Sequence, residues 1–137
     1  MNSHGLLLVA HGSKDPEWST PFKAIEAAVK ESFPGPAVLT YLESTAPRID
    51  EGLAILVTHG VDRITVAPLF LAEGSHVRVD IPNLIRGFGA RHSQITFSIL
   101  PAIGHLPAVQ ALIASEVVHQ LAAHAGSQRA FSTETKK

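Results

Sequence analysis

The chain of 137 residues has the length of one ordinary domain, and 45% hydrophobic against 17% charged residues is typical of a folded core, not of a disordered chain. Eleven basic and twelve acidic residues give a net charge of -1, which argues against a general binder of nucleic acid or of anionic membranes. Cysteine is absent and histidine occurs eight times, so disulfides, thiolate metal sites and cysteine nucleophiles are excluded and any metal ligands are imidazole and carboxylate.

Four apolar runs rich in branched residues predict β-strands, over residues 5–10, 37–42, 64–69 and 95–100. The first three are almost continuously apolar, which is typical of parallel strands buried on both faces. The fourth alternates apolar and polar residues, which indicates an edge strand with one wetter face.

The first run is too short to span a bilayer, which needs ~20 residues, and it lacks the flanks of a signal peptide. We therefore expect a cytoplasmic protein with no membrane partner.

Apolar residues at helical spacing predict a helix after each strand. The first pattern covers residues 22–33 and ends at Pro34, the second covers 49–56, the third covers 77–88 and the fourth covers 109–121. A proline is best tolerated in the opening turn of a helix, so Pro82 predicts that the third helix begins near Val79.

This alternation predicts one α/β domain over residues 1–125, followed by a polar tail over 126–137 that we expect to be disordered. The expected architecture is a flavodoxin-like three-layer sandwich around a four-stranded parallel sheet of order 2-1-3-4.

Three residues suited to chemistry follow three of the predicted strands. His11 follows the first strand, Glu43 ends the second and His76 lies beyond the third. Ligands of open parallel sheets bind at the carboxyl ends of the strands, where the strand order reverses, so we expect these side chains to converge on one rim. Each also fits a structural role alone, as a helix cap, a solvated charge or a loop histidine. Their joint placement favours a site.

The chain lacks the glycine patterns of phosphate and dinucleotide sites and the GxSxG elbow of serine hydrolases. Ala10 precedes His11, where phosphohistidine phosphatases carry an arginine. Two imidazole nitrogens and one carboxylate suit borderline divalent ions such as cobalt, nickel or iron. Three protein ligands also leave coordination positions open, so that the ion can depart.

Four segments together resemble the short sirohydrochlorin chelatases, the small CbiX-type proteins of cobalamin biosynthesis; these are Leu6–Pro16, Tyr41–Glu43, Ala67–Leu71 and Gly74–Pro82. The similarity runs from about Leu6 to Leu121, and Ser75 departs from the family pattern, in which a second glycine is usual. The resemblance implies a chelatase that inserts a divalent ion, cobalt before iron or nickel, into sirohydrochlorin without ATP or an organic cofactor.

On the matched positions, the resemblance implies that His11 and His76 bind the metal, that Glu43 assists, and that these three are the catalytic residues. One imidazole would accept the pyrrole protons. The residues expected to contact the tetrapyrrole are Ser13, Lys14, Leu69, Phe70, Gly74, Ser75 and Arg78.

Longer chelatases hold the tetrapyrrole between two domains, so the resemblance also implies a homodimer. Sirohydrochlorin bears many carboxylates, and the cations expected near the rim are Lys14, Arg48, Arg78 and Arg86. Two other classes of function remain open: a metal carrier that does no ring chemistry, and a relative of the same fold that binds a small anion through its histidines.

Overall fold

The computed structural model describes residues 3–125, except for the side chain of His76. The described chain falls into two compact units, the first ending at His105 and the second beginning at Leu106, and each is considered by itself. The predicted tail at 126–137 lies outside the described residues.

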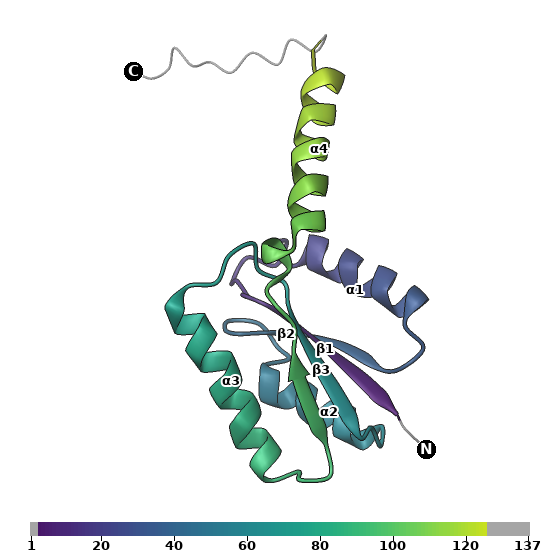
Figure 1. Ribbon diagram of the computed structural model, residues 1–137, viewed down its shortest axis with the longest axis vertical. Coiled ribbons are helices and arrows are strands. Elements are labelled where there is room, and N and C mark those ends of the chain that lie inside the picture. The colour runs from purple at the N-terminus through teal and green to yellow at the C-terminus, as the bar shows by residue number, and fades with distance from the viewer. Residues whose placement is uncertain (1–2, 126–137) are drawn as a thin grey trace. The chain divides into compact units, whose positions relative to one another are not determined.

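The first unit is built on a parallel sheet of order β2-β1-β3-β4 (Figure 1), which confirms the predicted topology and the edge position of the fourth strand. Its strands are β1 (His4–Ala10), β2 (Ala37–Tyr41), β3 (Arg63–Pro68) and β4 (Thr96–Ile99). In the register, Val9 of β1 lies beside Thr40 of β2 and Pro68 of β3. The carboxyl ends of these three strands therefore share one edge of the sheet.

Helices cover both faces of the sheet, as the predicted three layers require. Alternate residues of the strands point to opposite faces. Leu7, Val9, Ile64 and Val66 pack in the larger core with residues of α2 (Ile49–Thr58) and α3 (Ser75–Ala90). Leu8 and Tyr41 point to the other face, where Trp18 and Phe22 pack against them; Phe22 belongs to α1 (Thr20–Ser32).

The third helix begins four residues before the predicted start, at Ser75 in place of Val79, and it holds Pro82 in its interior. Gly74 precedes it in an extended conformation, and Val77 and Ile81 pack on the core. Burial of this helix face offsets the backbone hydrogen bond that Pro82 cannot donate, so tertiary packing outweighs the local preference on which the prediction rested.

The first unit ends in a short 3-10 helix, η1 (Ile103–His105), and the second unit holds α4 (Pro107–Ala123), which begins with proline in its first turn. The sequence of α4 is largely apolar on all sides, with Glu116 and His119 as its ionisable residues. Within residues 3–125, no helix combines the length and the apolar character needed to cross a bilayer.

Candidate active site

Hydrogen bonds tie together the loops that follow β1 and β2. The N–H of Leu42 donates to the carbonyl of Ala10 at 3.0 Å, and the N–H of Glu43 donates to the carbonyl of His11 at 3.1 Å. These bonds continue the strand pairing past the ends of both strands. His11 and Glu43 are therefore held side by side by the backbone.

A threonine side chain adds a second link between the same loops. The hydroxyl of Thr45 donates to the carbonyl of Ser13 at 2.9 Å and accepts from the N–H of Ser13 at 3.3 Å. We call this pair of hydrogen bonds the Thr45–Ser13 clasp. The clasp thus links the loop that carries the imidazole to the loop that carries the carboxylate.

Gly12 allows the closest approach between these loops. Its φ is +102°, a conformation that other residues rarely adopt, and a Cβ at this position would stand 1.8 Å from the carbonyl oxygen of Glu43. Only glycine fits at this point without moving the loops apart.

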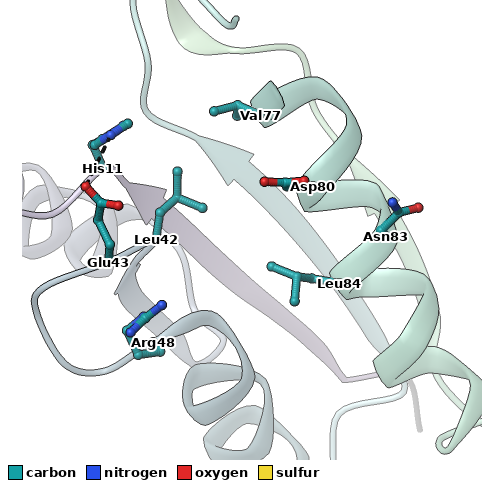
Figure 2. Close-up of a pocket in the computed structure, with 8 residues that line it drawn as sticks. All are labelled: His11, Leu42, Glu43, Arg48, Val77, Asp80, Asn83 and Leu84. Carbon is teal, nitrogen blue, oxygen red and sulfur yellow. Dashed lines mark ion pairs between the residues drawn. The ribbon is translucent and has the colours of Figure 1, made fainter. Parts of the chain in front are cut away.

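The polar ends of His11 and Glu43 face each other across 3.8 Å, from Nε2 to Oε2 (Figure 2). Both side chains are more than half exposed, at 56% and 62%. Phe70, which is buried in the core, meets the imidazole edge-on with 6.2 Å between ring centres. The ring is thus supported by an apolar neighbour, while its nitrogen and the carboxylate are open to a ligand from solvent.

A cleft of about 480 Å³ opens beside this pair, between the loops and α3. Figure 2 shows Asp80 and Asn83 of α3 across the cleft from Glu43. The lining is part apolar and part polar, and consists of His11, Leu42, Glu43, Arg48, Val77, Asp80, Asn83 and Leu84. A cleft of this size and mixed lining is typical of sites for small organic ligands.

Of the three predicted metal ligands, the structure brings His11 and Glu43 together. The backbone of His76 lies in the first turn of α3, next to Val77 of the cleft wall, and its side chain lies outside the described part of the structure. Among the described side chains, no three histidine or acidic residues form a group that could hold a metal ion. The proposed three-ligand set therefore depends on His76.

None of the residues expected to contact a tetrapyrrole lines the cleft. Ser13 belongs to the clasp, Phe70 supports His11 from the core, and Leu69 packs beside Trp18 on the face of α1. Arg78 donates from Nη1 to the carbonyl of Glu73 at 3.0 Å and lines a separate cavity. The remaining three are exposed, and are Lys14, Gly74 and Ser75.

The cleft wall formed by α3 is absent from the sequence-based set of site residues. Val77, Asp80 and Leu84 are spaced three and four apart, so they share one face of a helix. That spacing is the signal available in the sequence, once the helix is known to begin at Ser75 rather than near Val79.

The fold and the cleft define an α/β protein with an open parallel sheet, whose imidazole–carboxylate pair lies at the carboxyl ends of the strands, where ligands of such sheets bind. The sequence profile of the CbiX family matches residues 5–120, and the chain belongs to this family.

Curated relatives and solved structures agree with this assignment. The chain is 42% identical over 82 residues to a protein of Sulfolobus acidocaldarius named sirohydrochlorin cobaltochelatase, a match that covers 60% of this chain and 66% of the relative. A protein of the same name from Methanothermobacter thermautotrophicus is 33% identical over 81 residues, which cover 59% of this chain and 57% of the relative. The matches thus span less than two thirds of these relatives' own length.

Among solved structures, a putative cobalamin biosynthesis CbiX protein from Marinobacter aquaeolei superposes with a TM-score of 0.79 and 33% identity, over 88% of this chain and 98% of that one. The sirohydrochlorin chelatase SirB from Bacillus subtilis, in complex with cobalt, gives a TM-score of 0.69 and 27% identity. That match covers 74% of this chain and 44% of SirB, which has also been solved with Fe³⁺.

Proposed function

We propose that the protein is an enzyme that inserts a divalent metal ion, cobalt in the first place, into sirohydrochlorin. The observation that carries the proposal is the His11–Glu43 pair, 3.8 Å apart and open to solvent on the rim of a 480 Å³ cleft. The relatives named sirohydrochlorin cobaltochelatase support the choice of reaction and of metal.

In this proposal, His11, Glu43 and His76 hold the incoming ion as substrate. Imidazole nitrogen suits cobalt, iron and nickel, and a set of only three protein ligands leaves positions for the macrocycle nitrogens to replace water. The ion is transferred when those nitrogens displace the protein ligands in turn.

Insertion exchanges one divalent ion for two pyrrole N–H protons of the macrocycle, so the site must also accept protons. An imidazole titrates near neutral pH and is suited to this task. The carboxylate of Glu43 stands next to the imidazole of His11, 3.8 Å from its Nε2. Apolar wall residues Leu42, Val77 and Leu84 offer a surface for the flat ring.

Iron for siroheme, or nickel, is the close alternative on the same ligand set, because the affinity order of such ligands does not select one metal and cells select by supply. The solved SirB structures with cobalt and with Fe³⁺ support iron as an alternative to cobalt.

We also propose that the working form is a homodimer, which would complete the tetrapyrrole site from two copies. The match covers 44% of the SirB chain, so the unmatched part of SirB is longer than the part that this chain matches. A single copy of this chain therefore lacks a counterpart of that additional part, which a second copy would supply. Helix α4 supports the proposal as well: a helix that is largely apolar on all sides needs partners on more than one side.

The test follows the absorbance of sirohydrochlorin with cobalt, iron and nickel side by side, with and without the protein. We expect a spectral change that the protein accelerates, most strongly with cobalt. Binding of metal without acceleration would reject the enzyme in favour of a metal carrier, and faster insertion of iron or nickel would reassign the metal. Sedimentation of the active protein as a strict monomer would reject the shared site.

A further inference from the structure

Arg48 places a positive charge at the end of the cleft away from His11. Arg48 lines both the main cleft and a smaller cavity of about 320 Å³ that shares Leu42 and Leu84 with it. Figure 2 shows Arg48 below Glu43 and Leu42, on the loop that leads into α2, with Leu84 across the cleft. The residue is exposed, so a ligand in the cleft can reach its guanidinium.

The fold itself does not require this guanidinium. The backbone of Arg48 begins α2: its N–H donates to Oε1 of Glu51 at 2.7 Å, and its carbonyl accepts from the N–H of Gly52 at 2.9 Å. A cation at the start of a helix is disfavoured by the helix dipole. Two ion pairs occur among the side chains that the structure describes, His11–Glu43 and Lys30–Glu26, and neither involves Arg48.

The other cations expected near the rim are placed differently. Arg78 donates to the carbonyl of Glu73, Arg86 donates to the side chain of Asn83, and Lys14 lies exposed on the loop after β1. Of the four candidates, Arg48 alone lines the cleft.

We propose that Arg48 binds a peripheral carboxylate of the tetrapyrrole and so sets the position of the ring relative to His11 and Glu43. This inference rests on the proposed function and names the part of the substrate that the residue recognises. A planar guanidinium binds a carboxylate through two parallel hydrogen bonds, which fixes direction as well as distance. Glu43, beside His11 in the cleft lining, repels carboxylates, so the substrate's acid groups are directed toward Arg48.

The test compares Arg48→Met and Arg48→Lys with a matched control, Arg63→Met. Arg63 is an exposed arginine at the first position of β3, at the opposite end of the strand from the cleft. Affinity for metal-free sirohydrochlorin is measured by absorbance titration, and KM and kcat for cobalt insertion are measured separately. The same titration is repeated with the methyl ester of sirohydrochlorin, which keeps the ring and removes the carboxylate charges.

Arg48→Met is expected to weaken binding and raise KM about tenfold, which is about 1.4 kcal/mol, with kcat changed less than about twofold. Arg48→Lys keeps the charge without the planar fork and should recover part of the affinity. Arg63→Met should behave as the wild type, and the ester should bind equally to the wild type and to Arg48→Met.

Three outcomes would overturn the inference. If Arg48→Met binds sirohydrochlorin as the wild type does while cobalt insertion proceeds, the role of Arg48 is refuted and the proposed function stands. An equal loss of affinity for the ester and for the free acid would trace the effect to packing rather than to a carboxylate. A wild-type protein that does not bind sirohydrochlorin at all would refute both the inference and the proposed function.

Discussion

Replacement of Gly12 by alanine tests how the structure holds the imidazole and the carboxylate together. Gly12 has a φ of +102°, and an added Cβ would stand 1.8 Å from the carbonyl oxygen of Glu43. That neighbour is backbone, so no side-chain rotation can relieve the overlap. The loops after β1 and β2 must move apart.

The expected cost has two parts. Alanine at a positive φ costs about 1–2 kcal/mol by itself. Separation of the loops also breaks the backbone hydrogen bonds Leu42–Ala10 and Glu43–His11, at about 1 kcal/mol each. The free energy of unfolding should therefore fall by about 3–4 kcal/mol in Gly12→Ala. Because a shift of about 1 Å in a reacting group can cost about 100-fold in rate, metal insertion should fall by a similar factor.

Gly60→Ala is the matched control. Gly60 also has a positive φ, +72°, but nothing lies within 4 Å of an added Cβ, and it follows the end of α2, away from the cleft. This variant should lose only the conformational part, about 1–2 kcal/mol, and keep its insertion rate. Urea denaturation and the absorbance assay measure both quantities. A Gly12→Ala protein as stable and as active as Gly60→Ala would refute the reasoning.

Three further predictions follow from other contacts. Burial, and then the charge of Arg63, lower the pKa of His4, so the unfolded chain binds protons more readily and the free energy of unfolding should fall as the pH drops below about 6.5. In His4→Gln, urea denaturation at pH 7 and pH 5 should differ less than in the wild type, and an unchanged difference would contradict this. Thr45→Val removes the clasp hydroxyl and should cost about 1 kcal/mol of stability and part of the insertion rate, whereas Thr45→Ser should keep both; equal behaviour of the two variants would exclude the clasp. Leu112→Asp in α4 should shift the protein toward monomer in sedimentation, and a dimer of undiminished stability would remove α4 from the interface.

Much of the fold can be predicted from local patterns. Continuous apolar runs mark the inner strands, and the alternation of Thr96, Phe97 and Ser98 marks the edge strand, because burial on one face or two determines which residues a strand tolerates. The start of α3 cannot be predicted in this way. Local preference places Pro82 in a first turn, and only the packing of Val77 and Ile81 on the sheet reveals the earlier start.

Part of the candidate site can also be predicted from the sequence, and part cannot. The proximity of His11 to Glu43 can be predicted from the strand order, because both residues come at the carboxyl ends of adjacent parallel strands. The close approach of Gly12 to Glu43 depends on the register between loops, which no local pattern specifies. Arg48 is the one of the four candidate cations that lines the cleft, and this likewise depends on the conformation of the loop before α2, which no local pattern specifies.

The most direct test of the central claim is the rate of cobalt insertion into sirohydrochlorin by His11→Ala and His76→Ala, each shown by circular dichroism to be folded. If both imidazoles hold the ion or accept protons at one rim with Glu43, each variant should lose a factor of at least ~100, and Glu43→Gln should lose less. Wild-type rates in both histidine variants would contradict the account.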